Sequence, residues 1–203
     1  MQKTLVIMAK APAMGRVKTR LARDIGAVEA TRFYRVALAR LIRQMASDPR
    51  WQTVISASPD TQALPSEHWL LDANAGVPQG NGDLGARMQS VFDKAPCGPT
   101  VIVGSDIPDI SSKHIAQAFQ TLGDHEAVIG PSVDGGYWLI GQTRMPRVLE
   151  PFNGVEWSSG RERDQTLANF GNARVAMLGE LSDVDNGTDH ARWRKAEGIR
   201  KLR

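Results

Sequence analysis

The stretch TVIVGSD, residues 100–106, has four β-branched residues directly before a glycine, a serine and Asp106. A short run of this kind is typical of a strand that is buried on both faces, as in a parallel sheet. A second apolar run, TLVIMA at Thr4–Ala9, is followed by Pro12, which cannot continue a central strand. The two runs predict buried strands of a parallel sheet.

Strand patterns alternate with helix patterns along the rest of the chain. Further strands are expected at 53–57, 68–71, 127–130, 137–141 and 174–178. Helices are expected at 27–47, 85–94, 111–122, 161–170 and from Thr188 or Asp189 to Arg200. This order predicts an α/β sandwich around a mostly parallel sheet, in one domain over residues 1–203. Ligands of such sheets lie beyond the carboxyl ends of the strands, so the loops after Ala9, Gly104 and Gly130 are candidate site walls.

The composition is that of an ordinary globular protein, and it excludes several functional classes. The chain has 203 residues, 41% of them hydrophobic, and one cysteine, Cys97, which excludes an internal disulfide and a CxxC site. No apolar run approaches the roughly 20 residues of a membrane span or the core of a signal peptide. We therefore expect a cytoplasmic protein with no membrane span. The basic C-terminus lacks an interleaved aromatic platform, so no nucleic-acid partner is expected.

Charge is distributed unevenly along the chain. Residues 1–50 carry 11 basic and 3 acidic side chains, whereas residues 51–150 carry 5 basic and 11 acidic ones. Part of the basic surplus lies in KAPAMGRVKTR, residues 10–20, directly after the first predicted strand. This loop contains Lys10, Gly15, Arg16, Lys18 and Arg20. It lacks the P-loop motif, and its composition alone also suits a solvated loop, but its place at a strand end favours phosphate binding.

The stretch GNGDLG, residues 80–85, matches the GxGxxG pattern of dinucleotide-binding proteins. That motif must follow its strand directly, and here the residues 76–78 intervene, which argues against a dinucleotide site. A glycine-rich loop that lets a nucleotide approach the backbone remains an alternative. Its candidate contacts are Gly82, Asp83, Leu84 and Gly85.

Three acidic segments follow predicted strands or precede the last helix. Asp106 lies just beyond a buried strand, which suits a Mg²⁺ ligand because this ion prefers carboxylates, phosphates and water. Asp134 precedes Gly135, Gly136 and Tyr137, and this segment is either a simple hairpin turn or a wall close to a ligand. Asp185, in the segment DVDN, is either a second metal ligand or a neighbour of the residues that cap the last helix.

Six segments together resemble a known family. They are MAKAPAMGRVKTRL (8–21), QGNGDLGARM (79–88), VIVGSDIPDIS (101–111), IGPSVDGGYWLIG (129–141), VEWSSG (155–160) and LSDVDNGTDH (181–190). The chain resembles an uncharacterised bacterial family of the DUF2064 type, within the nucleotide-diphospho-sugar transferase superfamily. That family is related to the 2-phospholactate and molybdenum-cofactor guanylyltransferases, and some members are described as glycosyltransferases.

The resemblance implies a Rossmann-like α/β/α sandwich of GT-A type that binds a nucleotide with Mg²⁺ or Mn²⁺. It implies phosphate or nucleotide contacts from Lys10, Gly15, Arg16, Lys18, Arg20, Gly82, Asp83, Leu84, Gly85 and Ser105. It implies metal binding by Asp106 and Asp185, with Gly135, Gly136 and Tyr137 on the acceptor side. Asp134 and Lys18 are the catalytic candidates. Sugar nucleotidyltransferases instead open with a GxGTR-type loop followed by Pro-Lys, and KAPAMGRVKTR differs from it.

Three hypotheses follow for the function. In the first, a glycosyl group passes from a nucleotide-diphospho-sugar to a small acceptor. In the second, an acceptor attacks the α-phosphorus of a nucleoside triphosphate and pyrophosphate leaves. Both reactions need cations that stabilise the charge developing in the transition state. In the third, the protein binds a nucleotide without turnover.

Overall fold

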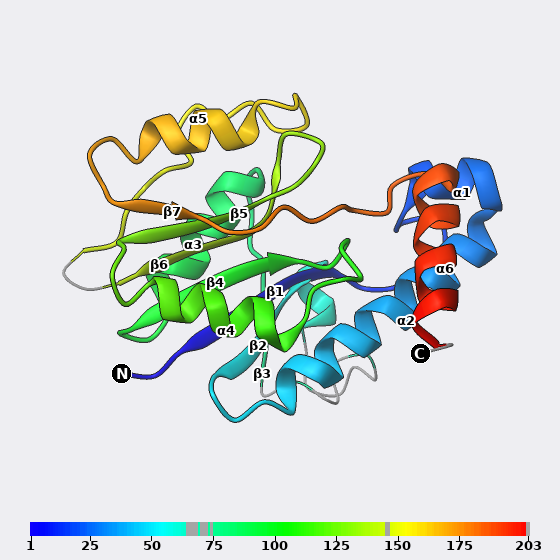
Figure 1. Cartoon of the computed structure of the whole chain (residues 1–203), viewed down its shortest axis with the longest axis horizontal. Helices are drawn as coiled ribbons and strands as arrows, with labels where there is room; N and C mark the ends of the chain where they lie inside the picture. Colours follow the sequence, from blue (N-terminus) through cyan, green and yellow to red (C-terminus); the bar gives the residue numbers. More distant parts are fainter. Residues whose placement is uncertain (64–68, 70–72, 74, 145–146, 202–203) are drawn as a thin grey trace.

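The computed structural model describes residues 1–63, 69, 73, 75–144 and 147–201, with the side chains of the last three excepted. In this part of the chain seven strands form one sheet in the order β3-β2-β1-β4-β6-β5-β7 (Figure 1). The strands are β1 (Thr4–Lys10), β2 (Gln52–Ser58), β3 (Ala75–Pro78), β4 (Pro99–Gly104), β5 (Ala127–Pro131), β6 (Tyr137–Thr143) and β7 (Val175–Met177). The helices are α1 (Thr19–Ile25), α2 (Ala27–Ala46), α3 (Leu84–Lys94), α4 (Ser112–Thr121), α5 (Glu162–Asn169) and α6 (Gly187–Lys201), with the short 3-10 helix η1 (Asp60–Gln62).

The sheet is mostly parallel, as predicted. Strand β1 pairs in parallel with β2 and β4, β2 with β3, and β5 with β7, whereas β6 runs antiparallel to both β4 and β5. Strands β1, β4 and β5 therefore end at the same edge of the sheet, where β6 begins. This arrangement brings the loops after Lys10, Gly104 and Pro131 together, although they are far apart in the sequence.

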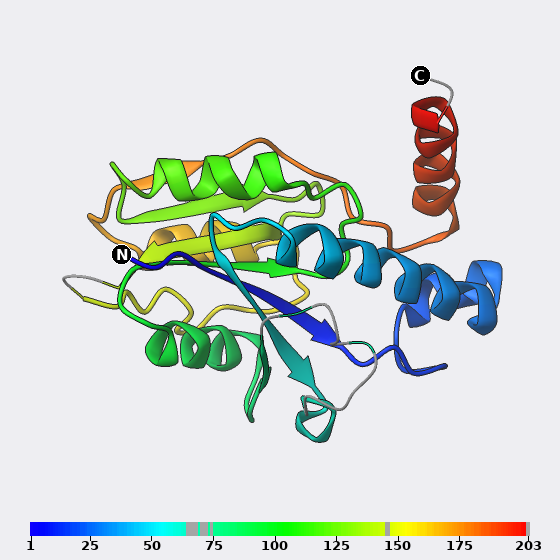
Figure 2. The ribbon, with the colours of Figure 1, turned by 90° about the horizontal axis from the view of Figure 1, so that it is seen from below.

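Helices cover both faces of the sheet (Figure 2). Alternate residues of β1 point to opposite faces: Leu5 and Ile7 pack into the cluster that includes α2 and α4, while Val6 and Met8 pack against α3. All four side chains are buried, which explains the continuous apolar run. The α/β sandwich expected from the alternation of elements is confirmed, and so is the α/β/α layering that the family resemblance implied.

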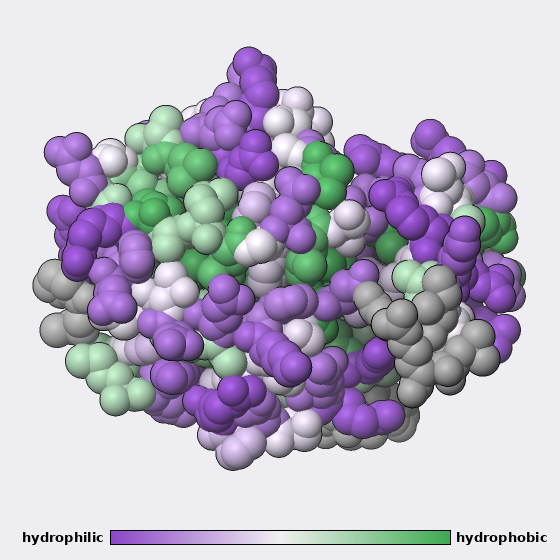
Figure 3. All heavy atoms as spheres, in the orientation of Figure 1, coloured by the Kyte–Doolittle hydropathy of each residue, from purple (hydrophilic) through white to green (hydrophobic). Residues whose placement is uncertain are grey.

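A smaller cluster holds α1, α6 and the start of α2 together at one end of the molecule (Figure 1). Leu21, Ala30 and Val184 are its buried residues, with Phe33 and Trp193 packed against them. The face drawn in Figure 3 is hollowed between this end and the layered body. This packing fixes the last helix and the acidic segment before it against the basic N-terminal segment.

Two expectations about the secondary structure were wrong. The basic segment at residues 10–20 is not a loop throughout, since α1 begins at Thr19 and places Arg20 in a helix. Residues 75–78 form the edge strand β3, so a strand does lie just before the glycine-rich segment, contrary to the argument made against GxGxxG. The strand expected at 68–71 falls mainly outside the described residues. Within the described residues, no helix is long and apolar enough to cross a membrane.

Candidate active site

A cavity of about 890 Å³ lies at the edge of the sheet where β1 and β4 end. The predicted site residues that line it are Lys10, Arg16, Lys18, Arg20, Gly82, Asp83, Leu84, Ser105, Asp106, Asp134, Gly136, Tyr137 and Asp185. The predicted residues that do not line it are Gly15, Gly85 and Gly135. The structure thus gathers segments from both halves of the chain around one space.

Lys18 lies at the centre of the charged part of this cavity. Its Nζ atom is 2.9 Å from Asp185 Oδ1 and 3.4 Å from Asp106 Oδ1, and its side chain is only 5% exposed. Burial alone would lower the pKa of Lys18, but the two carboxylates outweigh burial and raise it above its ordinary value. The ammonium group is therefore charged, and it joins the two acids predicted to bind a metal.

The backbone at Lys18 is as unusual as its side chain. Its φ of 46° and ψ of 46° lie in the left-handed region, directly before α1, which few residues other than glycine adopt. Val17 beside it is buried in the core. The left-handed turn directs Lys18 inward, whereas Arg20, two residues later, is 72% exposed and only reaches Asp185 Oδ2 at 3.4 Å.

Asp106 and Asp185 fit a divalent cation by their chemistry. Among the described residues, no group of three or more His, Cys, Asp or Glu side chains is placed to hold a metal. However, Mg²⁺ commonly takes one or two carboxylates and completes its shell with water and substrate phosphates. Both carboxylates already pair with Lys18, Asp185 also pairs with Arg20, and the side chains of Asp106 and Asp185 are 57% and 32% exposed. A divalent ion at this position would have to displace the lysine ammonium group.

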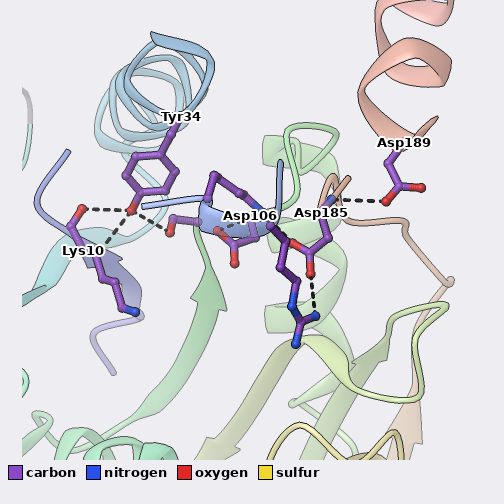
Figure 4. A network of polar contacts seen from close by, with 8 residues as sticks. Lys10, Tyr34, Asp106, Asp185 and Asp189 are labelled. Atoms are coloured by element: carbon purple, nitrogen blue, oxygen red, sulfur yellow. Dashed lines mark hydrogen bonds and ion pairs between the residues drawn. The ribbon is translucent and has the colours of Figure 1, made fainter. Parts of the chain in front are cut away.

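The segment before α6 orients Asp185. The backbone N–H of Asp185 donates to Asp189 Oδ2 at 3.2 Å (Figure 4). The N–H of Asp189 donates to Asn186 Oδ1 at 3.0 Å. The side chains of Asn186 and Asp189 thus accept hydrogen bonds from backbone N–H groups around the start of α6, whereas the Asp185 carboxylate faces the cavity. Asp24 Oδ2 accepts from the N–H of Gly187 at 2.7 Å, which ties the same segment to α1.

Tyr34, which the sequence did not single out, fixes the start of the basic loop. Its hydroxyl accepts from the backbone N–H of Lys10 at 3.0 Å and lies 2.9 Å from the Lys10 carbonyl and 3.1 Å from Ser105 Oγ (Figure 4). Burial is the main cause that raises the pKa of Tyr34 to about 12, so the hydroxyl keeps its proton. Its position on the buried face of α2 was the available signal, because a buried tyrosine hydroxyl needs a partner.

Arg87 and Gln79, also not singled out, shape the glycine-rich segment. Arg87 Nε donates to the Gly82 carbonyl at 3.1 Å, and its guanidinium donates to Gln79 Oε1 at 3.2 Å. Gln79 Nε2 in turn donates to the Ser56 carbonyl at 2.9 Å. Asp83 accepts from the N–H of Ala86 at 2.8 Å and caps α3. Asp83 therefore has a structural role at this helix start in addition to lining the cavity.

The loop between β5 and β6 forms the other side of the cavity. Asp134 Oδ1 accepts from Ser132 Oγ at 2.5 Å and from the N–H of Gly136 at 3.0 Å. Asp183, from the segment before α6, lines the same side. Burial, followed by the charges of Asp185 and Asp134, raises the pKa of Asp183 to about 6. The charges of both Asp185 and Asp134 thus act on the Asp183 carboxyl group.

Substituting Gly135 with alanine is expected to destabilise the protein by more than about 2 kcal/mol in urea unfolding. Its φ is +89°, and an added Cβ would overlap the carbonyl oxygen of Gly160. A left-handed conformation alone costs a non-glycine residue roughly 1–2 kcal/mol, and the backbone overlap adds to it. Gly154 is the matched control, because it has φ +69° but no atom within 4 Å of an added Cβ. Equal losses at both positions would contradict the predicted overlap.

Solved structures share this fold. A candidate nucleotide-diphospho-sugar transferase from Desulfovibrio desulfuricans G20 has a TM-score of 0.81 and 28% identity, over 92% of this chain and 84% of that chain. Rv0371c from Mycobacterium tuberculosis H37Rv, in complex with manganese, has a TM-score of 0.52 and 18% identity, over 95% and 97% of the two chains. CMP:2-keto-3-deoxy-manno-octonic acid synthetase, complexed with CTP, has a TM-score of 0.59 and 10% identity, over 98% and 100%.

The sequence also matches a protein-family model. That model, described as "Uncharacterized protein conserved in bacteria (DUF2064)", matches residues 41–159, which is more than half of the chain. No curated protein sequence matches the chain. The matched region includes β2, β4, β5 and β6, and with them Asp106 and Asp134 of the cavity. The protein therefore belongs to the DUF2064 family of bacterial proteins and has the fold of a nucleotide-diphospho-sugar transferase.

Proposed function

We propose that the protein is a transferase that moves a glycosyl group from a nucleotide-diphospho-sugar to a small acceptor, with Mg²⁺ or Mn²⁺. The observation that carries the proposal is that one cavity is lined both by the cations at and after the end of β1 and by Asp134 and Asp183. The name of the Desulfovibrio protein, and the manganese held by the mycobacterial one, support the reaction class and the metal. Their residues are not carried over to this chain.

The proposed roles follow from the charges along the cavity. Lys10, Arg16, Lys18 and Arg20 would hold the diphosphate, and Asp106 with Asp185 would hold the metal. The metal, when bound, would supply positive charge against the departing diphosphate. An acceptor hydroxyl would attack the anomeric carbon, and the bond from this carbon to the diphosphate oxygen would break. Asp134, which lines the same cavity, would take the proton of the hydroxyl as a general base.

The backbone of the basic loop favours glycosyl transfer over nucleotidyl transfer. The N–H groups of Ala11, Ala13 and Arg16 donate to carbonyls of Ser58, Ala11 and Ala13, at 2.8, 2.7 and 3.1 Å. Pro12 has no N–H. These amides are therefore not available to a triphosphate, which the glycine-rich loops of nucleotidyltransferases hold through their backbone. With these three amides engaged, the loop offers a triphosphate fewer backbone donors, and the side chains of Lys10, Arg16, Lys18 and Arg20 supply positive charge for a diphosphate.

Product analysis tests the proposal. Nucleotide-diphospho-sugars and nucleoside triphosphates are incubated with the protein, Mg²⁺ or Mn²⁺ and a panel of acceptors, and the products are identified by mass spectrometry. Release of a nucleoside diphosphate supports glycosyl transfer, and release of pyrophosphate supports nucleotidyl transfer instead. Binding without turnover across the panel would indicate the non-catalytic alternative.

Replacing Asp134 with asparagine tests its proposed role as the general base. The asparagine oxygen can still accept from Ser132 and Gly136, but it cannot take a proton. We expect nucleotide binding within about twofold of wild type, and turnover lowered by roughly 10²–10⁴-fold, the range for loss of a general base. Unchanged turnover would remove Asp134 from the catalytic step.

A further inference from the structure

Positive charge is distributed unevenly among the segments that line the cavity. Among the described residues that line it, the five basic side chains are Lys10, Arg16, Lys18, Arg20 and Arg87, from the segment after β1 and from α3. These cations lie beside Asp106 and Asp185, which both pair with Lys18. A second group of lining segments, here called the acidic end, consists of the β5–β6 loop, the start of β6, residues 157–162 and Asp183. The described lining residues of that end include three acids, Asp134, Glu162 and Asp183, and no lysine or arginine.

The arginines nearest in sequence to this acidic end are engaged elsewhere. Arg161 pairs with Glu156 and is exposed, and Arg163 pairs with Asp164 at 3.2 Å. Neither lines the cavity. The lysine closest to Asp183 is Lys18, which is held by Asp106 and Asp185. Lys18 is the basic residue whose charge acts on Asp183, and among the described residues no ion pair joins Asp134 or Glu162 to a lysine or arginine, so a ligand at the acidic end meets an excess of carboxylates.

Aromatic and hydroxyl groups complete this end of the cavity. Tyr137 and Trp157 line it, together with Ser132 and Ser158, whereas Trp138, which also borders it, is only 2% exposed and donates its N–H to the Gly179 carbonyl. Trp157 also lies over the glycine-rich segment, because an added Cβ at Gly85 would meet its ring at 2.8 Å. Apolar ring surface beside carboxylates and hydroxyls is typical of sites that bind polyhydroxylated or cationic molecules.

We propose that the acceptor is an uncharged or cationic hydroxylated molecule, such as a sugar or an amino sugar, and not a phosphorylated or carboxylated one. This inference rests on the proposed transferase function. An anionic acceptor would place its charge beside Asp134 and Asp183, and like charges in contact disfavour binding strongly. The proposal separates this protein from the 2-phospholactate guanylyltransferases that its sequence resembles, whose named acceptor carries a phosphate and a carboxylate.

A matched set of sugars tests the acceptor class on the wild-type protein. The probes are methyl α-D-glucopyranoside, D-glucosamine, D-glucose 6-phosphate and D-glucuronate, titrated at pH 7 and followed by saturation-transfer NMR, with Mg²⁺ and with EDTA. We expect the neutral and amino sugars to bind at least about tenfold more tightly than either anion, a ratio that corresponds to about 1.4 kcal/mol. An anion that binds as tightly as the neutral sugar, under either condition, overturns the proposal. Absence of binding by both uncharged and cationic probes also overturns it.

Removing the Asp183 carboxylate tests whether the preference for uncharged and cationic sugars arises at this end of the cavity. In Asp183→Asn we expect the ratio between D-glucosamine and D-glucose 6-phosphate to fall by about fivefold, the effect of roughly 1 kcal/mol. Asp164→Asn removes an exposed carboxylate from α5 that does not line the cavity, and it should keep the wild-type ratio. If Asp183→Asn keeps the wild-type ratio, or Asp164→Asn lowers it equally, the assignment is wrong.

Nucleotide binding is measured in a separate titration, so that a failure of the transferase proposal can be distinguished from a failure of the proposed acceptor class. If a nucleoside diphosphate binds with Mg²⁺ while an anionic sugar is preferred, the transferase proposal stands and the acceptor class is wrong. If no nucleotide binds, the transferase proposal falls, and the order of the four sugars still decides the chemistry of the acidic end.

Discussion

Replacing Asp106 with asparagine is expected to weaken Mg²⁺-dependent binding of nucleoside diphosphates by at least about 100-fold. Loss of a residue that merely orients a metal ligand typically lowers metal affinity by 10–100-fold, and loss of a direct carboxylate ligand should have at least that effect. Asparagine keeps the shape of the side chain but removes the negative charge that attracts the ion. Isothermal titration of each diphosphate with Mg²⁺ and with EDTA measures the change.

The effect of Asp106→Asn should be confined to the metal-dependent part of binding. The Asp106 side chain is 57% exposed, so the substitution should leave the fold intact, and circular dichroism checks this. Asp93→Asn, on the exposed side of α3 and outside the cavity lining, is the control for general loss of charge. Wild-type affinity in a folded Asp106→Asn protein would remove this residue from the metal site.

Replacing Lys18 with methionine is expected to change two affinities in opposite directions. The ammonium group contacts both Asp106 and Asp185, so it competes with a divalent cation for the same carboxylates. Without it, Mn²⁺ alone should bind about tenfold more tightly, which electron paramagnetic resonance of free Mn²⁺ can follow. Nucleoside diphosphate should bind about 10–100-fold more weakly, the effect of losing a charged hydrogen bond to phosphate.

The opposite signs distinguish a functional role of Lys18 from a merely structural one. Damage to the fold would weaken both ligands, whereas the loss of competition strengthens the metal alone. Lys113→Met, on the exposed surface of α4, is the matched control and should leave both affinities unchanged. If Mn²⁺ binds Lys18→Met no more tightly than wild type, the lysine does not compete with the metal.

Most of the fold could be predicted from local patterns. Strands β1 and β4 are continuous apolar runs because both of their faces are covered, and such runs are visible in the sequence. The edge strand β3 was missed because its four residues include a glycine and end on Pro78, and both residue types are depleted in strands. Helix α1 was missed because it has only seven residues, beginning at Thr19, and because the residue before it, Lys18, is in a left-handed conformation and provides no capping side chain.

The candidate site could be predicted in part. Strand ends indicated the basic loop, Asp106 and Asp134, because the carboxyl ends of parallel strands meet at one edge. The contacts of Tyr34 with Lys10 and Ser105 could not be predicted, since Tyr34 comes from α2 and no motif marks it. The same holds for Arg87, whose partner Gln79 lies on the far side of a turn.

The sequence by itself determined the layered α/β architecture, the edge of the sheet that holds the site and the kinds of charge gathered there. These follow from periodicities of a few residues, which act within each element. Only the tertiary structure decided that Lys18 lies between Asp106 and Asp185, because Lys18 and Asp185 are 167 residues apart. Their contact depends on Val184 packing with Leu21 and Ala30 in the cluster around α1. That packing is a property of the whole fold, and no local pattern encodes it.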